Sequence, residues 1–389
     1  MNTQKLKQEF KKIFGYTSSR VYFSPGRINL IGEHTDYNGG YVFPCAISMG
    51  TYGVFAKRQD QKVRLYSANM PDDGLVEFDI DDLKLKKHDN WTKFPRGVMF
   101  ELANQGYKIN QGFDLFVEGD LPDASGLSSS ASIELLIGTI LKQEYDLKID
   151  ALGLVKTGQL VENDYLGLNT GIMDQFAIGM GKKDRAILLD TNNLKYEYLP
   201  VELDNYVIVI MNTNKQRQLV DSKYNERRSE CEKALVLIQK QDNVKTLGDL
   251  SPERFDRDTY LINDETLIKR ARHAVSENQR TLRAKKALTQ GKLAEFGQLM
   301  NASHISLHYD YEVTGPELDT LAQTAWEQPG VLGARMTGAG FGGCAIAIVD
   351  QSKTDDFIKN VGDVYKQKIG YPASFYVANI ADGPKCLER

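Results

Sequence analysis

The stretch Gly26-Arg27-Ile28-Asn29-Leu30-Ile31-Gly32-Glu33-His34-Thr35-Asp36-Tyr37-Asn38-Gly39-Gly40 is the most informative part of this chain. Ile28 and Leu30 alternate with Arg27 and Asn29, in the period of a half-buried strand. The pair Asn38-Gly39 is a strong hairpin signal, and a second apolar run follows it at 41–47. The stretch therefore predicts a polar loop held on a rigid β frame.

The polar residues of this loop indicate the kind of ligand that it binds. Glu33, His34 and Asp36 provide carboxylate acceptors and one switchable donor within four positions. Such a set suits a ligand covered in hydroxyl groups better than it suits a metal ion. We expect the ligand to be a sugar or a polyol.

The composition narrows the class of protein. A chain of 389 residues is long enough for two or three domains, each with its own core. Lys and Arg number 48 against 52 Asp and Glu, and the positive charges are spread along the chain, which argues against nucleic acid as a partner. The four cysteines are far apart with no C-x-x-C, which argues against a zinc site and a disulfide framework and fits a reducing cytosol.

The apolar segments argue against export and membrane insertion. The N-terminus has no apolar run of signal-peptide length, and the longest runs, such as 207–211, have the size of a strand. We therefore expect a cytoplasmic protein with no membrane partner. An amphipathic helix near the N-terminus could lie on an anionic membrane, but Glu9 interrupts its basic face, which favours a helix docked on its own domain. Its apolar stripe is formed by Leu6, Phe10, Ile13 and Phe14.

Strand and helix patterns alternate across the chain and predict an α+β or α/β fold. Strand patterns occur at 21–23, 27–31, 41–47, 52–57, 63–67, 76–80, 113–118, 186–190, 206–211, 344–349 and 374–378. Helix patterns occur from Ser130 to about 168, at 216–241 and at 264–307. We expect a turn at 191–193 to join two strands, and a domain boundary in the polar stretch 195–204, with lobes at 1–200 and 201–389.

A small-residue loop, Pro122-Asp123-Ala124-Ser125-Gly126-Leu127-Ser128-Ser129-Ser130-Ala131, leads from the strand at 113–118 directly into a helix. Backbone N–H groups in such a loop, together with the positive end of the helix, make an anion site. No Walker motif is present, but a serine in the first helical turn could bind magnesium, and Ser130 is the candidate. The alternative is that Ser128 to Ser130 only cap the helix.

A second glycine-rich loop, Gly338-Ala339-Gly340-Phe341-Gly342-Gly343, matches the dinucleotide pattern G-x-G-x-x-G. A dinucleotide loop opens a helix, whereas this loop precedes a strand at 344–349, so a dinucleotide site is excluded. Either the loop is a tight turn or its backbone approaches a ligand closely.

Three further features have both a functional and a structural interpretation. Glu162 interrupts a mostly apolar helical row and needs a partner, which could be a metal ion or, more commonly, a salt bridge. Asp174 is flanked by apolar residues and would be an N-cap or surface acid in most proteins. His304 and His308 are spaced i, i+4, which permits metal binding but is usually structural.

Together the three motifs resemble those of the GHMP small-molecule kinases, and most closely the galactokinase-like members of that superfamily. The segment 27–40 resembles a galactokinase-like signature, 126–131 the phosphate-binding motif, and 336–343 the third motif. Similarity extends through 160–167, 171–176 and 222–230. One departure is Ala124, where many members have glycine, so the approach of the loop to the nucleotide could differ slightly.

The resemblance implies a fold of two α+β lobes with the active site in the cleft between them, and a C-terminal segment that returns to the first lobe. It implies transfer of the γ-phosphoryl group of MgATP to the anomeric hydroxyl of α-D-galactose, the first committed step of the Leloir pathway. It also implies a monomer.

The resemblance assigns roles to individual residues. Asp174 would be the base and Arg27 would stabilise charge on the transferred group. The residues that hold the sugar would be Glu33, His34, Thr35, Asp36, Tyr224 and Asp174. Those that bind the nucleotide would be Ala124, Ser125, Gly126, Leu127, Ser128, Ser129 and Ser130, with Ser67 and Trp91 in its pocket. Magnesium would be bound by Ser130 and Glu162.

Two alternatives share this fold. One is an N-acetylgalactosamine kinase, whose pocket would need room for an acetamido group. The other is a galactose and ATP sensor without turnover, against which the presence of Arg27, Ser130, Glu162 and Asp174 argues.

Overall fold

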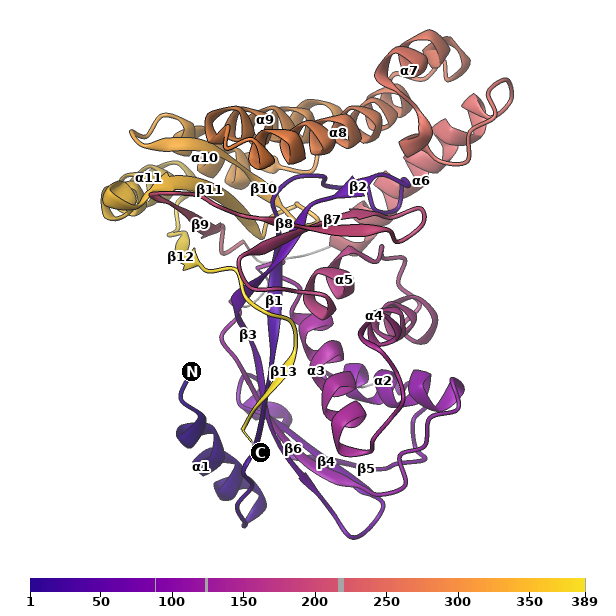
Figure 1. Cartoon of the computed structure of the whole chain (residues 1–389), viewed down its shortest axis with the longest axis vertical. Coiled ribbons are helices and arrows are strands. Elements are labelled where there is room, and N and C mark those ends of the chain that lie inside the picture. The colour runs from indigo at the N-terminus through magenta and orange to yellow at the C-terminus, as the bar shows by residue number, and fades with distance from the viewer. Residues whose placement is uncertain (88, 123–124, 216–219, 389) are drawn as a thin grey trace.

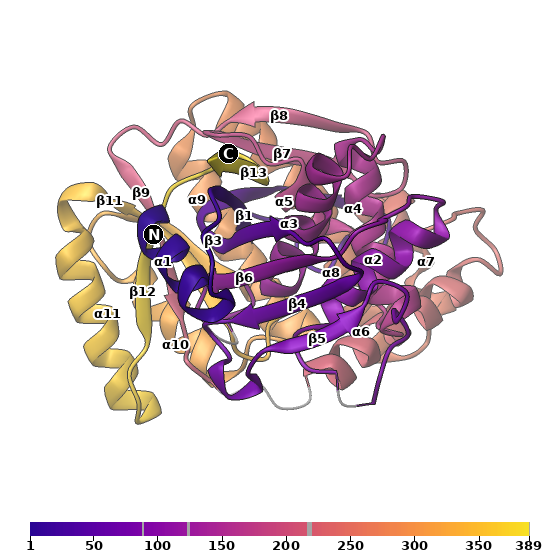
Figure 2. The same cartoon turned by 90° about the horizontal axis from the view of Figure 1, so that it is seen from below.

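A six-stranded sheet dominates the N-terminal half of the chain in the computed structural model, which describes residues 1–87, 89–122, 125–215 and 220–388. All neighbouring strands are antiparallel except β4 and β6. Figure 2 shows β3, β6, β4 and β5 side by side in this sheet. In spatial order the strands are β13 (Lys385–Glu388), β1 (Arg20–Asn29), β3 (Pro44–Lys57), β6 (Phe113–Gly119), β4 (Lys62–Ser67) and β5 (Val76–Asp79).

Helices cover both faces of this sheet. On one face, α3 contacts β1 and β3, and the apolar residues between them form the largest core cluster. On the other, α1 (Thr3–Phe14) packs on β3 and β6 and buries Leu6, Phe10 and Phe14, so the amphipathic N-terminal helix docks on its own domain. The helices of the first face are α2 (Lys93–Asn104), α3 (Ser129–Glu144), α4 (Ala151–Leu160) and α5 (Met173–Gly179).

The C-terminal half is a second layered unit, drawn in the upper part of Figure 1. Its sheet has the order β10 (Val331–Thr337), β11 (Cys344–Asp350), β9 (Tyr206–Asn212) and β12 (Ser374–Ala378). A three-stranded sheet contains β2 (Tyr41–Val42), β7 (Arg185–Asp190) and β8 (Tyr196–Pro200). The helices are α6 (Val220–Ile238), α7 (Pro252–Asp258), α8 (Glu265–Thr289), α9 (Leu293–Ser306), α10 (Gly315–Trp326) and α11 (Thr354–Ile369).

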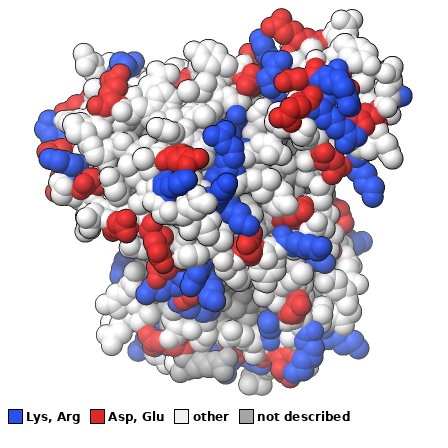
Figure 3. Space-filling model, turned by 45° about the horizontal axis from the view of Figure 1, so that its top comes forward, with Lys and Arg blue, Asp and Glu red and all other residues white. Residues whose placement is uncertain are grey.

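Short helical segments complete the fold. Two have π-helical hydrogen bonding, η2 (Val161–Tyr165) and η5 (Leu307–Tyr311). The others are the 3-10 turns η1 (Pro71–Asp73), η3 (Leu247–Asp249), η4 (Thr259–Leu261) and η6 (Gln351–Lys353). None of the helices in the described part of the chain is long and apolar enough to span a membrane. On the face shown in Figure 3, charged side chains of both signs are interspersed.

One local prediction from the sequence is wrong. The strands on either side of Asn38-Gly39 do pair, with Asn29 opposite Pro44, but residues 30–43 join them in place of a tight hairpin. The turn predicted at 191–193 is confirmed: it joins β7 to β8, a strand that the sequence analysis missed within the polar stretch 195–204. The pattern of β8 is obscured because its first two residues are exposed and Leu199 alone is buried.

Candidate active site

A cavity of about 170 Å³ brings together most of the predicted sugar-site residues. Residues from the loop after β1, from the start of α5, from α6 and from the glycine loop between β10 and β11 surround it. Its lining includes Arg27, Glu33, His34, Asp36, Glu162, Asp174, Tyr224, Gly338 and Ala339. Thr35 does not line the cavity; it is buried, and its hydroxyl contacts the carbonyl oxygens of Gly32 and Tyr41, which indicates a structural role within the loop.

Arg27 and Asp174 form a bidentate ion pair at one wall of the cavity. Arg27 Nε and Nη2 each donate to an oxygen of Asp174 at 2.8 Å, and Nη1 donates to the carbonyl of Gly126 at 2.6 Å. Burial disfavours the charge of Arg27, but the charge and hydrogen bonds of Asp174 outweigh this, so the pKa of Arg27 is raised. Asp174 lies in the first turn of α5, where the helix dipole favours a negative charge. The pair thus holds a fixed cation and anion beside the phosphate loop.

The carboxylate of Asp36 faces the same cavity, where its ionised form is disfavoured. Burial, and then the negative charges of Asp174 and Glu33, raise its pKa to about 7. Gly171 packs against it so closely that a Cβ at this position would lie 1.8 Å from Asp36 Oδ2. A hydroxyl group that donates to Asp36 in the cavity would lower this pKa, because it would favour the ionised form of Asp36.

A hydrogen-bond chain determines which nitrogen of His34 carries the proton. Burial, assisted by the charge of His273, lowers the pKa of His34 to about 3, so the ring is neutral. Nε2 lies 3.1 Å from the carbonyl oxygen of Ala339, which can only accept, so Nε2 is the donor. Nδ1 must then accept from the Tyr37 hydroxyl at 2.7 Å, and the Tyr37 oxygen accepts in turn from Tyr311 at 2.8 Å.

The chain ends at a buried thiol. Cys231 Sγ lies 3.1 Å from the Tyr311 oxygen, which is free to accept because the proton of Tyr311 is directed at Tyr37. The Cys231 thiol thus donates to Tyr311, Tyr311 donates to Tyr37, and Tyr37 donates to His34. The arrangement fixes the tautomer of His34 and holds its Nε2–H on the carbonyl oxygen of Ala339, which also lines the cavity.

A second cavity, of about 180 Å³, lies on the other side of the start of α3. It contains both residues proposed for the nucleotide pocket, Ser67 and Trp91, and it is lined by Thr51, Ser67, Asn69, Met70, Trp91, Phe94, Val117, Gly119, Leu121, Ser129, Ser130 and Ile133. Trp91 Nε1 is buried with no hydrogen-bond partner among the described residues. This nitrogen has almost no accessible surface, so the cavity meets Trp91 through other atoms of the side chain.

One hydrogen bond joins the walls of the two cavities. Ser130 Oγ, on the wall of the second cavity, donates to Glu162 Oε1, on the wall of the first, at 3.0 Å. The other oxygen of Glu162 accepts from the Thr170 hydroxyl at 2.6 Å. No salt bridge to Glu162 is present among the described residues, and burial raises its pKa. The two cavities thus adjoin at the hydroxyl of Ser130 and the carboxylate of Glu162.

The small-residue loop is not a simple helix cap. Ser128 has φ of 64° and makes no capping bond to α3; its hydroxyl donates to Asp174 Oδ2 at 2.5 Å. The alternative that this serine only caps the helix is therefore wrong. Ser125 is buried, and the side chain of Leu127 belongs to the core, so only the backbone of Leu127 could meet a ligand. Ala124 lies outside the described residues.

The third glycine motif contacts the sugar-site residues through its backbone. It connects the antiparallel strands β10 and β11, as expected for a loop that is not a dinucleotide site. Gly338 N donates to Glu33 Oε1 at 2.6 Å, and the carbonyl of Ala339 accepts from His34. The motif is therefore more than a tight turn.

The predicted histidine pair has a structural role. His304 Nε2 and His308 Nδ1 lie 3.1 and 2.8 Å from the two oxygens of Asp319, and His304 Nδ1 accepts from the backbone N–H of Met336. In the described part of the chain, no cluster of three or more His, Cys, Asp or Glu residues is arranged to hold a metal ion.

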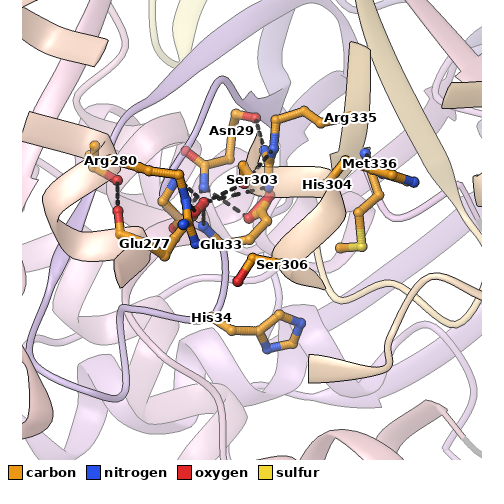
Figure 4. Close-up of polar contacts among 12 residues, drawn as sticks. Asn29, Glu33, His34, Glu277, Arg280, Ser303, His304, Ser306, Arg335 and Met336 are labelled. Carbon is orange, nitrogen blue, oxygen red and sulfur yellow. Dashed lines mark hydrogen bonds and ion pairs between the residues drawn. The ribbon is translucent and has the colours of Figure 1, made fainter. Parts of the chain in front are cut away.

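Sequence reasoning missed a group of buried charges behind the loop. Figure 4 shows Arg335 and Glu277 converging with Glu33, while His34 lies apart from them. Arg335 stands in an otherwise apolar strand directly before the glycine motif, which is a signal that could have identified it. Glu277 is one charge among many on α8, and its sequence context gives no such signal.

Comparison with known proteins adds independent information. A model described as the galactokinase galactose-binding signature matches residues 8–57, and models of the GHMP kinase N-terminal and C-terminal domains match 94–182 and 284–367. The chain is 65% identical to a galactokinase of Lactiplantibacillus plantarum over all of both chains, and 62% identical to one of Levilactobacillus brevis over 99% of each.

Solved structures agree with these matches. The crystal structure of Lactococcus lactis galactokinase complexed with galactose superimposes with a TM-score of 0.97 at 56% identity, covering 99% of this chain and 100% of that one. A mevalonate kinase superimposes with a TM-score of 0.66 at 18% identity, covering 93% and 99%, and this likeness concerns the fold alone. The predicted two-lobed α+β GHMP kinase fold is confirmed.

Proposed function

The chain belongs to the galactokinase family of the GHMP kinases and is an ATP-dependent kinase of galactose, and on that premise we propose which residues bind and activate its substrates. The reaction transfers the γ-phosphoryl group of ATP to the C1 hydroxyl of α-D-galactose and yields galactose 1-phosphate and ADP. The observation that supports the assignment of residues is the hydrogen bond between Ser130 and Glu162, because it joins the cavity that contains the sugar-site candidates to the cavity that contains the candidates for the nucleotide pocket.

The first cavity binds galactose. Glu33 and Asp36 accept sugar hydroxyls, and His34, Tyr224 and Asp174 complete the wall. Acceptors fixed in this way discriminate between epimers, because a hydroxyl with the wrong configuration leaves a buried group unpaired.

Arg27 and Asp174 are the catalytic pair. Asp174 lies beside the reacting hydroxyl and accepts its proton, while Arg27 stabilises negative charge on the transferred group. Since phosphoryl transfer has a loose transition state, orientation by this pair contributes strongly even if the proton leaves late. Asp174→Asn should lower kcat at least a hundredfold with the fold intact, and near-normal turnover would contradict the role of base.

ATP occupies the second cavity and the adjoining loop. Residues 125–130 surround the phosphates at the start of α3, where backbone N–H groups and the helix dipole favour anions. Ser67 lines the pocket of the base and ribose, and the Trp91 side chain forms part of its wall. Trp91→Phe replaces the indole with a smaller aromatic ring and alters this wall, so a rise in KM for ATP alone is expected.

Ser130 and Glu162 fit a magnesium ion. A hydroxyl and a buried carboxylate 3.0 Å apart are the hard oxygen ligands that Mg²⁺ uses together with phosphate oxygens and water. The bound ion would neutralise charge on the ATP phosphates. Glu162→Gln should raise the Mg²⁺ concentration needed for half-maximal activity, and an unchanged requirement would exclude Glu162 as a ligand.

A coupled assay of ADP release with galactose, N-acetylgalactosamine, glucose and mevalonate tests the whole assignment. Release with galactose alone is expected. Faster release with N-acetylgalactosamine would favour that kinase, and no sugar-dependent release would favour a sensor. The names of the relatives favour neither alternative.

We also propose that the enzyme acts in the cytoplasm as a monomer. Its four cysteines are free thiols, as suits a reducing compartment. Sedimentation at micromolar concentration tests the monomer.

A further inference from the structure

Arg335 is a buried cation that does not line the sugar cavity. It has no exposed surface, and it projects from β10 between two buried carboxylates, those of Glu33 and Glu277. A buried charge is costly unless it is paired and hydrogen-bonded, so its retention here requires a compensating role. Figure 4 shows the group that surrounds it.

The guanidinium contacts three separate elements. Nη1 donates to the carbonyl oxygen of Asn29 on β1 at 3.0 Å, and Nε donates to Ser303 Oγ on α9 at 3.2 Å. Nη2 lies 4.0 Å from Glu277 Oε1 on α8. Only a planar fork reaches all three directions at once, which a lysine ammonium cannot do.

The Arg335 guanidinium attracts Glu33 but leaves part of its hydrogen-bond acceptor capacity unused. Arg335 Nη1 lies 3.5 Å from Glu33 Oε1, whose closest donor is Gly338 N at 2.6 Å. Oε2 accepts from Asn29 Nδ2 at 2.8 Å and keeps further acceptor capacity. Burial raises the pKa of Glu33, and among the opposing influences the charge of Arg335 is the largest.

Glu277 balances the remaining charge. It accepts from the backbone N–H groups of Gly32 and Glu33 at 3.0 and 3.2 Å, and it pairs with Arg280 at 2.8 Å. The two arginines and two glutamates thus form a neutral cluster. Within it, Arg335 is the cation next to Glu33.

We propose that Arg335 is a positioning residue for galactose binding, which acts by orienting Glu33 and keeping it ionised as a hydroxyl acceptor. This inference rests on the proposed role of Glu33 in the sugar cavity. It predicts an effect on galactose and not on ATP, because the cluster lies behind the first cavity and contributes no residue to the second.

Two double variants with the same charge change test the proposal. R335Q/E277Q and R280Q/E277Q each remove one cation and one anion from the cluster, and they differ only in which arginine is lost. For R335Q/E277Q we expect KM for galactose to rise about 10- to 100-fold, because the sugar loses its hydrogen bond to the ionised Glu33. KM for ATP should stay within about threefold of the wild-type value. For R280Q/E277Q we expect KM for galactose at least about fivefold below that of R335Q/E277Q. Equal effects in both variants would overturn the proposal and indicate a structural cluster.

Two additions keep the result interpretable. Glu33→Gln should raise KM for galactose; if it does not, the proposed sugar site fails, whereas a defect in Glu33→Gln without one in R335Q/E277Q refutes only the role of Arg335. If R335Q/E277Q does not fold, Arg335→Lys is compared with Arg280→Lys. The same difference in KM for galactose is then expected, and its absence refutes the role of Arg335.

Discussion

The pKa of Asp36 makes the stability of the enzyme depend on pH in a way that can be calculated. In the unfolded chain this carboxyl group has a pKa near 3.8, and in the folded protein the pKa rises to about 7. Between these two values the unfolded chain loses its proton first, so the free energy of unfolding falls as the pH rises. Below the window both states are protonated, and above it both are ionised, so the slope disappears.

Asp36→Asn removes this dependence, since asparagine resembles the protonated acid and does not titrate. At 1.36 kcal/mol per pKa unit, the full window corresponds to about 4 kcal/mol. Between pH 5 and pH 8, after a discount for the partial exposure of Asp36 at the cavity, the stability of the variant relative to the wild type should rise by about 2 kcal/mol. The variant is thus expected to gain on the wild type as the pH rises.

Urea unfolding at several pH values measures this difference through the midpoint and slope. Asp256→Asn, which alters an exposed carboxylate, is the matched control and should leave the difference flat. Saturating galactose should reduce the slope of the wild type, because a hydroxyl donated to Asp36 favours its ionised form. A difference between Asp36→Asn and wild type that stays constant within about 0.5 kcal/mol from pH 5 to pH 8 would refute the reasoning.

Three further predictions follow from contacts in the first cavity. Gly171→Ala places a methyl group 1.8 Å from the present position of Asp36 Oδ2, so KM for galactose should rise at least tenfold while KM for ATP stays unchanged. Steady-state kinetics measures both values, and an unchanged KM for galactose would contradict this prediction. Arg27→Ala should lower kcat more than it raises KM, and the reverse pattern would make Arg27 a binding group only. Tyr37→Phe removes the donor to His34 Nδ1, so the ¹⁵N signal of this nitrogen should move from its hydrogen-bonded position; an unchanged spectrum would rule out the proton arrangement derived above.

The sequence identified the polar loop at 33–36 and the small-residue loop at 125–130, but not the buried residues that hold the polar loop in place. Glu33, His34 and Asp36 could be recognised as a set because they stand within four positions of a loop between strands. The partners that hold them are remote: Gly338 and Arg335 lie about 300 positions from Glu33, and a local pattern contains no information on such contacts.

Local signals also failed where tertiary contacts override them. Asn38-Gly39 does lie in a turn, in which Asn38 N and Gly40 N donate to the Thr35 carbonyl, but the turn does not join the two strands directly. Its own carbonyl groups are bound by remote residues: that of Asn38 accepts from Gly248 N, and that of Gly39 accepts from the Asn192 side chain. A serine directly before a helix is typical of a helix cap, but Ser128 has a left-handed backbone conformation and its hydroxyl donates to Asp174 instead.

The position of β13 affects how the chain is assembled. This strand, residues 385–388, lies on β1, residues 20–29, with Tyr22 opposite Cys386. Roughly 355 residues separate the two strands, so during synthesis β1 remains an open sheet edge until residues 385–388 have left the ribosome. The segment 385–388 therefore closes this edge late, and disrupting it should lower the yield of folded protein during synthesis more than the activity of molecules already folded.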